Sequence, residues 1–553
     1  MRPEPDHILI APILIPLIAG ALMLFYEERQ RRVIAVVSVV AQLIVAIELV
    51  DMASRETSTI GLYLLGNWPP PFAIVLVLDR LSALMVLLTA ILALPAIVFS
   101  MARWDRRGQH FHSLFQFMLM GLSGAFLTGD LFNLFVFFEV LLAASYGLAL
   151  HGSGTLRVRA GLHYIAMNLG ASLLFLIGVS LIYGVTGTLN MADLAVRVPL
   201  VPVENRPLLA AGAAVLGIAF LVKAAMWPLC FWLPITYMAA APPAAAMFAV
   251  LSKVGVYVVL RVSSLAFGTA AAHMTGLGAE LLLAGGLATL VFGTIGVLAS
   301  QGLGRLAGCT VLVSSGTLLA VVGIAGMGGG SIMVAGALFY LVVSTIAISA
   351  LFLMVELIER EQGALAGILT VTAEAYGLGD EDIDEAEVRE TGGGGAGPGV
   401  PGATTLLALG FILCALLLAG MPPFAGFLGK FAMLSAVLSA GGLNAGEVSW
   451  VALVFVAGVI LSGLAALIAL VREGIRTFWA SEYEELPAVP LIELVPVLLL
   501  LALTVVMTVK AGPVMRYMEA TASTLNHPHV YVRGVLGTSG LPSGGGQAVD
   551  ADE

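Results

Sequence analysis

Apolar segments of about 20 residues, the length that a helix needs to span the hydrocarbon of a bilayer, recur along almost the whole chain. The 553 residues are 59% hydrophobic and only 11% charged, which is typical of polytopic membrane proteins rather than large soluble ones. We therefore predict an all-α membrane protein of about fourteen spans. They are expected at residues 8–25, 33–53, 73–102, 113–128, 131–150, 160–185, 208–238, 242–264, 278–300, 306–325, 331–358, 404–440, 450–471 and 489–510.

The even number of spans places both termini on one side of the membrane. Alternate loops carry a modest excess of Lys and Arg on one side, which favours a cytoplasmic location for those loops and an external location for the termini. The first apolar segment is followed by arginines and lacks a small-residue cleavage site. It is therefore expected to be a retained helix in the cell inner (plasma) membrane and not a signal peptide.

An acidic and glycine-rich segment interrupts the apolar pattern at residues 359–403. Its composition predicts a solvated cytoplasmic linker, of which the part from Glu374 to Gly402 is expected to be dispensable for transport. Asp380, Asp382 and Asp384 imitate the start of a calcium-binding loop, but Glu385 and Thr391 replace the glycine and glutamate that such a loop requires. Calcium binding is therefore not expected. Since much of the net charge of -10 lies here, it gives no indication of a nucleic-acid partner.

Three of the four lysines, Lys223, Lys253 and Lys430, lie inside apolar segments. A lysine at the bilayer centre costs roughly 2.5 to 3.5 kcal/mol on insertion scales and persists where it faces a bundle interior, a wet cavity or a counter-ion. Glu139 lies well inside its own apolar segment and is expected to pair with Lys223. Because desolvated lysine and glutamate can exchange protons near neutral pH, the set predicts a proton path. The alternative is a set of static ion pairs.

Two of the apolar segments contain prolines near these lysines. Lys223 precedes Pro228 in LVKAAMWPLCFWLP, and Lys430 follows Pro422 and Pro423 in AGMPPFAGFLGKF. Proline removes a backbone hydrogen bond, and in lipid the freed carbonyls need another donor. We therefore predict broken helices around buried polar sites, and their recurrence in the two halves suggests internal repeats.

Polar side chains in two further segments are candidates for lining a wet cavity. His163 and Asn168 lie five residues apart in one segment, and Ser314, Ser315 and Thr317 lie together in another. Interhelical hydrogen bonds or close packing of small residues would explain the same positions without a cavity. Both interpretations remain open at this point.

The other acids and the cysteines are expected to be structural. Asp79, Asp130, Glu280 and Glu493 lie near segment starts, where a carboxylate suits a helix N-terminus. The cysteines lie in apolar stretches without CxxC spacing, so no zinc site, disulfide or other metal site is assigned. They are Cys230, Cys309 and Cys414.

Several strings together resemble one family. GDLFNLFVFFEVLLAASYGL, HYIAMNLGASLLFLIGVSLIYGVTGTLNMADLA, KAAMWPLCFWLP, SKVGVYVVLR and GMPPFAGFLGKF are similar to the D-type component of the Mrp-type (also called Pha or Mnh) multisubunit monovalent cation/proton antiporters. The resemblance implies the fourteen-helix fold of the antiporter-like subunits of respiratory complex I, with two inverted five-helix repeats and broken helices 7 and 12. The implied division is 1–110 (helices 1–3), 111–266 (first repeat), 267–358 (start of the second repeat), 359–403 (linker), 404–475 (rest of the second repeat) and 476–553 (helix 14 and tail).

The resemblance also implies roles for the charged residues. Glu139 matches the family's fifth-helix glutamate, Lys223 its seventh-helix partner, Lys253 the eighth-helix relay lysine and Lys430 the terminal lysine of helix 12. Such a protein assembles with the A-, B-, C-, E-, F- and G-type components of the same antiporter. It is a transporter component, without a redox cofactor or enzymatic activity.

Three positions depart from the family pattern. Cys230 and Ile235 stand where histidine and aspartate are common, and Val343 stands where a histidine is common. The last departure removes a candidate relay group between Lys253 and Lys430, so a water chain is expected to bridge the gap.

The sequence therefore predicts a proton-translocating subunit that drives the efflux of Na⁺ or K⁺. Opening of the Glu139/Lys223 pair would release the Lys223 proton toward Lys253, because a buried ammonium is less stable without a neighbouring carboxylate. Two alternatives remain: a proton-pumping membrane subunit of a complex I-like or hydrogenase oxidoreductase, and a structural scaffold with vestigial charges.

Overall fold

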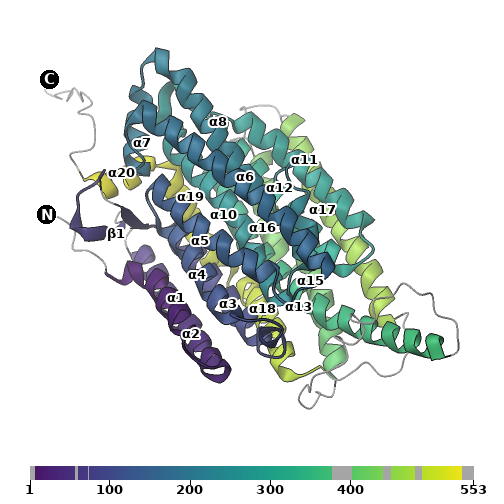
Figure 1. Cartoon of the computed structure of the whole chain (residues 1–553). Helices are drawn as coiled ribbons and strands as arrows, with labels where there is room; N and C mark the ends of the chain where they lie inside the picture. Colours follow the sequence, from purple (N-terminus) through teal and green to yellow (C-terminus); the bar gives the residue numbers. More distant parts are fainter. Residues whose placement is uncertain are drawn as a thin grey trace, which may run out of the picture.

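The fold of the chain is nearly all helical, as predicted. The computed structural model describes residues 7–55, 60–72, 74–375, 402–439, 450–479 and 489–537. Within these ranges, eleven helices are long and apolar enough to cross a membrane, and four shorter apolar helices accompany them. Every predicted span contains helix, so the all-α polytopic fold is confirmed. Both ends of the described chain lie at the same end of the bundle (Figure 1), as the even number of spans requires.

A break in the helices between Lys223 and Trp232 separates the elements into two groups. Before it lie α1 (Ala11–Leu22), α2 (Glu28–Arg55), β1 (Gly61–Leu64), β2 (Val75–Leu78), α3 (Arg80–Ser100), α4 (Phe111–Leu127), α5 (Leu131–Ala149), α6 (Thr155–Thr186), α7 (Met191–Arg197) and α8 (Arg206–Lys223). After it lie α9 (Trp232–Ala239), α10 (Pro242–Ala266), α11 (Ala279–Ala299), α12 (Leu303–Gly326), α13 (Ser331–Ala375), α15 (Ala403–Ala419), α16 (Ala425–Leu438), α17 (Trp450–Gly474), α18 (Leu491–Val509), α19 (Ala511–Asn526) and α20 (Pro528–Leu536).

The elements depart from the prediction at β2, at the end of α13 and in the C-terminal region. The third predicted span begins as strand β2, which pairs antiparallel with β1, because the apolar run 73–102 joins a buried strand to a helix. α13 extends to Ala375, so the first part of the expected linker is helical. The acidic stretch that follows, with the rejected calcium loop, lies outside the described residues. α19 and α20 were not predicted, because their polar faces hide them from a search for continuous apolar runs.

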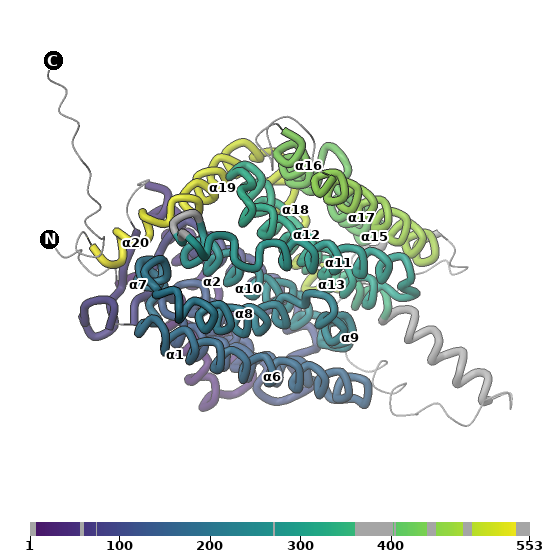
Figure 2. Tube along the Cα trace, turned by 90° about the horizontal axis from the view of Figure 1, so that it is seen from above, coloured from purple at the N-terminus to yellow at the C-terminus, as the bar shows by residue number. Residues whose placement is uncertain are grey.

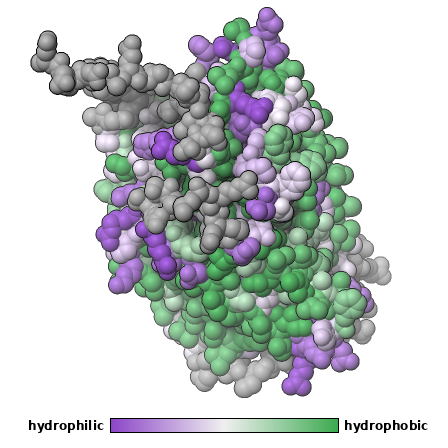
Figure 3. All heavy atoms as spheres, turned by 90° about the vertical axis from the view of Figure 1, so that its left-hand side faces the viewer, coloured by the Kyte–Doolittle hydropathy of each residue, from purple (hydrophilic) through white to green (hydrophobic). Residues whose placement is uncertain are grey.

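The centre of the bundle consists of α10, α12 and α13, whose spanning windows are completely buried. Helices that are hydrophobic all round are expected in such a position. Outer helices instead expose apolar side chains, as α6 does at Leu162, Leu169, Leu173 and Ile177. Hydrophobic side chains cover much of the face in Figure 3, with hydrophilic ones in separate patches. This arrangement suits a lipid-embedded bundle with a protein-enclosed centre.

A buried ion pair joins α3 and α10 at the end of the bundle that holds the termini. Asp79 caps α3, as predicted, by accepting from the backbone N of Ser82. It also accepts from Nη2 of Arg261 at 2.7 Å. Burial alone would raise the pKa of Asp79, but Arg261 and Ser82 hold that pKa below its usual value. The pair therefore stays ionised and fixes α10, the helix that carries Lys253.

The C-terminal helices cover this ion pair. The ring of Tyr531 in α20 lies 5.3 Å from the guanidinium carbon of Arg261, and the Tyr517 hydroxyl in α19 donates to the carbonyl of Arg80. α18, α19 and α20 follow one another along one side of the bundle (Figure 2). The end of the chain thus stabilises the central helices.

Candidate functional site

The predicted helix break after Lys223 is present. α8 ends at Lys223 and α9 begins at Trp232, with a cis peptide bond between Trp227 and Pro228. The backbone N of Trp227 donates to the Thr289 hydroxyl of α11 at 2.8 Å. Lys223 is therefore the last residue of a half-helix that ends inside the bundle.

Lys223 and Glu139 do not form the ion pair that the sequence suggested. Their charges are close enough to interact, but Lys223 Nζ and Glu139 Oε1 are both buried without a hydrogen-bond partner within the described residues. The ammonium lies 4.8 Å from the ring centroid of Phe138, and a cation over an aromatic ring is weakly stabilised. Phe138, the residue before Glu139, thus contacts the ammonium where the sequence predicted the carboxylate.

Lys253 lies at the centre of α10 and is completely buried. Its Nζ donates to the Ser315 hydroxyl of α12 at 3.3 Å. The adjacent residue on α12, Ser314, shares a 3.0 Å hydrogen bond with Ser344 of α13. The Tyr340 side chain, one turn before Ser344, lies beside Ser314. One α12 hydroxyl therefore contacts Lys253, and the hydroxyl of the preceding residue contacts α13.

The second predicted break places Lys430 against backbone carbonyls. α15 ends at Ala419 and α16 begins at Ala425, with a cis bond between Pro422 and Pro423. Lys430 Nζ donates at 3.0 Å to the carbonyls of both Leu418 and Ala419. Since the last carbonyls of a helix lack intrahelical donors, the lysine satisfies the end of the half-helix that precedes it.

Val343 of α13 is followed by a residue whose hydroxyl contacts α12. Val343 is buried, and the adjacent Ser344 supplies a hydroxyl in contact with α12. The backbone of Tyr340 packs closely on Gly429, the residue before Lys430. Ser344 and Tyr340 were missed from the sequence, because single hydroxyls in an apolar helix give no pattern.

Only part of the predicted cavity lining faces the interior. Asn168 is buried and lines a small cavity with Lys223. His163 is exposed on the outer side of α6, where its ring N donates to the carbonyl of Arg159. Of the two alternatives that the sequence left open, a cavity shared by the two residues does not hold for His163, because a separation of five residues turns them to different faces of the helix. Ser314, Ser315 and Thr317 are all buried on α12.

A second charged cluster lies at the opposite end of the bundle from the termini. Arg103, just after α3, lies 3.3 Å from Glu493 and 3.6 Å from Glu356. Glu493 occupies the first turn of α18, as predicted, and Glu356 belongs to α13. The cluster connects three helices that are distant in the sequence, and the sequence analysis missed it.

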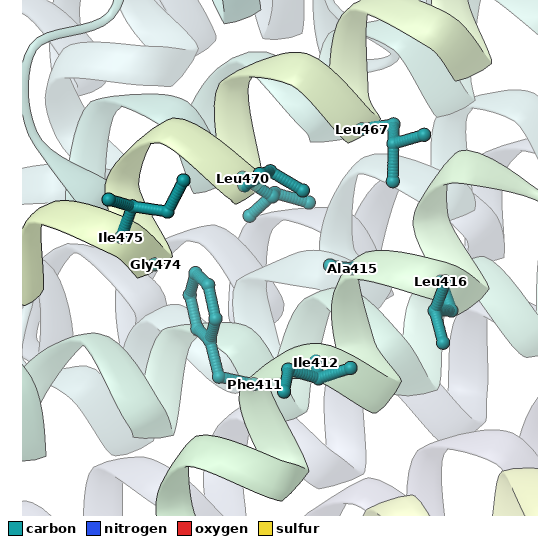
Figure 4. A pocket seen from close by; sticks show the side chains of 9 residues that line it. Phe411, Ile412, Ala415, Leu416, Leu467, Leu470, Gly474 and Ile475 are labelled. Carbon is teal, nitrogen blue, oxygen red and sulfur yellow. The ribbon is translucent and has the colours of Figure 1, made fainter. Parts of the chain in front are cut away.

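A pocket between α15 and α17 has an apolar lining. This pocket of about 260 Å³ is lined by apolar side chains such as Phe411, Ile412, Leu467 and Leu470 (Figure 4). Ala415, in the same lining, is one residue after the buried free thiol of Cys414. With no polar side chain among its described lining residues, the pocket is not a candidate ion site. The site therefore consists of the buried lysines and the hydroxyls around them.

The fold is that of an antiporter-like membrane subunit, and comparison with solved structures agrees. The chain is similar over 96% of its length, at 26% identity and a TM-score of 0.78, to the whole of a chain in the Mrp complex from Dietzia sp. DQ12-45-1b. It also shares its fold with a chain of respiratory complex I from Thermus thermophilus, at 22% identity and a TM-score of 0.70 over 94% of this chain and 99% of the other.

Sequence comparison identifies the family. Residues 128–372 match the family described as NADH:quinone oxidoreductase/Mrp antiporter, TM. The chain is 55% identical to the D component of a probable K⁺/H⁺ antiporter of Rhizobium meliloti, over 96% of this chain and 98% of the relative. It is 33% identical to the D component of the Na⁺/H⁺ antiporter of Alkalihalophilus pseudofirmus, over 96% and 99%. The chain belongs to the family of D-type components of Mrp-type cation/proton antiporters.

Proposed function

We propose that this subunit moves protons along Glu139, Lys223, Lys253 and Lys430, and that this flow drives efflux of a monovalent cation through the assembled complex. One observation carries the proposal. The three lysines are buried, and within the described ranges none of them contacts a carboxylate. A buried charge without an ionic partner is destabilising, so a purely structural role does not explain three of them in one subunit.

The environment of each lysine supports a separate step. Lys223 lies near Glu139 without being bound to it, so movement of one helix can change how strongly the carboxylate stabilises the ammonium. Lys253 already contacts a hydroxyl that can accept its proton. Lys430 binds two carbonyls, which stabilise its ammonium at the end of the proposed relay. A proton released by Lys223 would move toward Lys253 and then, through hydroxyls and water, toward Lys430.

The transported cation is proposed from the relatives. A relative named for K⁺ is 55% identical, whereas two relatives named for Na⁺ are 33% and 34% identical. K⁺ is therefore the first cation to test, with Na⁺ as the comparison.

The experiment is Lys223→Ala in the assembled complex. Cation/proton exchange in everted vesicles should fall to background, because the alanine cannot carry a proton, while the amount of subunit on a blot stays normal. Lys510→Ala is the matched control, since Lys510 is exposed between α18 and α19. Full exchange by Lys223→Ala at a normal protein level would contradict the proposal and favour a scaffold.

A further inference from the structure

A small cavity adjoins Lys223 and is lined in part by Leu251 of α10, the helix that carries Lys253. Its volume is about 10 Å³, close to the minimum of roughly 10 to 15 Å³ that holds one water molecule. The lining comes from α5, α6, α9, α10 and the end of α8. It consists of Phe138, Leu141, Leu142, Asn168, Lys223, Trp232, Tyr237 and Leu251.

Three polar atoms of this lining are buried without a hydrogen bond to any described residue. They are Lys223 Nζ, Trp232 Nε1 and the Tyr237 hydroxyl. Buried polar groups are almost always satisfied by protein or by ordered water. The ammonium and the indole N–H can only donate, whereas a tyrosine hydroxyl can both donate and accept. One water in the cavity would accept from the two donors and donate to Tyr237.

Tyr237 also reaches the helix of Lys253. Its hydroxyl lies beside that of Ser252 in α10, the residue immediately before Lys253. The Ser252 hydroxyl donates to its own helix at the carbonyl of Ala249, so its oxygen is available to accept. The Tyr237 ring is held between Phe248 of α10, at 5.4 Å between centroids, and Phe352 of α13, at 6.2 Å. The hydroxyl is therefore held in place between the cavity and α10.

We propose that Tyr237 carries the proton from Lys223 to α10, through one water in this cavity. This inference rests on the proposed function. The water takes a proton from Lys223 Nζ and gives one of its own to the Tyr237 oxygen, while the phenolic proton passes to the Ser252 oxygen. Ser252 then gives its original proton toward a neutral Lys253. The water and both hydroxyls end with their original number of hydrogens, Lys223 loses one proton and Lys253 gains one.

Tyr164 provides a matched control in the same aromatic cluster. It is as deeply buried as Tyr237, and its ring stacks on Trp232 at 5.3 Å. Its hydroxyl, however, shares a 2.7 Å hydrogen bond with Ser145 and does not line the cavity. Tyr164→Phe therefore removes an equivalent hydroxyl without interrupting the proposed connection.

The test compares Tyr237→Phe with Tyr164→Phe in the complete complex reconstituted in liposomes. Proton flux driven by a K⁺ gradient is measured in H₂O and in D₂O. Tyr237→Phe should lower the flux about tenfold, because a positioned proton carrier is lost. It should also raise the solvent isotope effect, because proton transfer across the gap becomes rate-limiting. Tyr164→Phe should leave both nearly unchanged. Tyr237→His, which restores a proton-carrying ring, should recover part of the flux.

Two outcomes overturn the inference. One is a normal flux and isotope effect in Tyr237→Phe. The other is an equal loss in Tyr164→Phe with no isotope change, which would indicate an effect on packing. If Tyr237→Phe does not assemble, Ser252→Ala interrupts the same connection without altering the aromatic cluster and should give the same loss. Failure of this inference can be distinguished from failure of the proposed function. If Lys223→Ala is inactive and Tyr237→Phe is normal, only the role of Tyr237 is rejected. If Lys223→Ala is active, the relay itself is rejected.

Discussion

Each of the two helix breaks lies near a buried lysine, but the lysine is hydrogen-bonded at only one of them. In each, a cis proline bond separates two half-helices inside the bundle. Lys223 ends the half-helix before its break and has no hydrogen-bond partner in the described structure. Lys430 belongs to the half-helix after its break and binds two carbonyls of the preceding one. Lys430 is thus hydrogen-bonded to the half-helix across its break, whereas Lys223 has no such bond.

This difference suggests two kinds of proton site. Two carbonyl acceptors stabilise the ammonium of Lys430, so in the proposed relay its proton would leave only when that contact changes. The Lys223 ammonium depends on Phe138 and on the nearby Glu139, so small movements change its stability. Lys223 is therefore suited to switching and Lys430 to holding a proton before release. Substitutions at and away from the breaks test this contrast, from the largest expected effect to the smallest.

Lys430→Arg should lose nearly all exchange although it conserves the charge. Arginine stays protonated at any physiological pH, whereas a buried lysine can release its proton. We expect a loss of at least about tenfold, as large as that of Lys430→Ala, in vesicle exchange assays between pH 7 and 9. Near-normal exchange by the arginine variant with an assembled complex would show that Lys430 is only a fixed positive charge.

Gly463→Ala should weaken the acceptor site of Lys430. A Cβ at Gly463 of α17 would lie 2.5 Å from the carbonyl oxygen of Ala419 and 3.3 Å from Lys430 Nζ, so the two partners of this hydrogen bond must shift. Loss of about one hydrogen bond, roughly 1 kcal/mol, corresponds to about a fivefold change in exchange rate, which vesicle exchange assays would measure.

Gly458→Ala is the control for this change. It lies on the same helix, but its Cβ would meet only the flexible side chain of Leu290. Equal effects of the two substitutions would mean that packing of α17, and not the Lys430 acceptor, determines the rate.

A third substitution should affect stability without affecting exchange. Asp105, in the short 3-10 turn Trp104–Arg106 that follows α3, binds Arg32 at 2.6 Å and His112 at 3.2 Å. Burial would raise the pKa of Asp105, but hydrogen bonds and charge from these two partners lower it below its usual value. A carboxyl with a depressed folded-state pKa stabilises the fold above the unfolded-state value, near about pH 3.9, and loses this contribution as the pH falls.

Asp105→Asn should therefore lower the melting temperature of the purified complex by about 2 °C at pH 7. The difference from the parent should shrink as the pH falls below roughly 4. Thermal unfolding followed by fluorescence at both pH values measures it. A difference that persists unchanged at low pH would contradict the assigned charge state.

The sequence was sufficient for the fold because hydrocarbon thickness sets the length of each apolar run. It also located both breaks, because Pro228 and Pro423 interrupt the apolar segments that contain Lys223 and Lys430. It did not predict the β1–β2 hairpin, because an apolar strand followed by an apolar helix has no boundary in composition. α19 and α20 were not predicted because each has a polar face, so neither contains a continuous apolar run.

The candidate site was predicted by residue type but not by contact. Burial of Lys223, Lys253 and Lys430 followed from the segments that hold them. The separation of Lys223 from Glu139, the carbonyl acceptors of Lys430 and the pairing of Ser314 with Ser344 depend on how helices cross, which one sequence does not specify. The exposure of His163 follows from the same cause, because only packing decides which face of α6 meets lipid.

Lys253 offers the most direct test of the account, since it lies between Lys223 and Lys430 in the proposed relay and its Nζ contacts the Ser315 hydroxyl of α12. The measurement is proton flux through the reconstituted complex carrying Lys253→Met, which keeps an unbranched side chain but cannot bind a proton. The relay predicts flux at the level of empty liposomes, with assembly intact and Lys510→Met normal. Flux at the parent rate in Lys253→Met would contradict a proton path through the buried lysines.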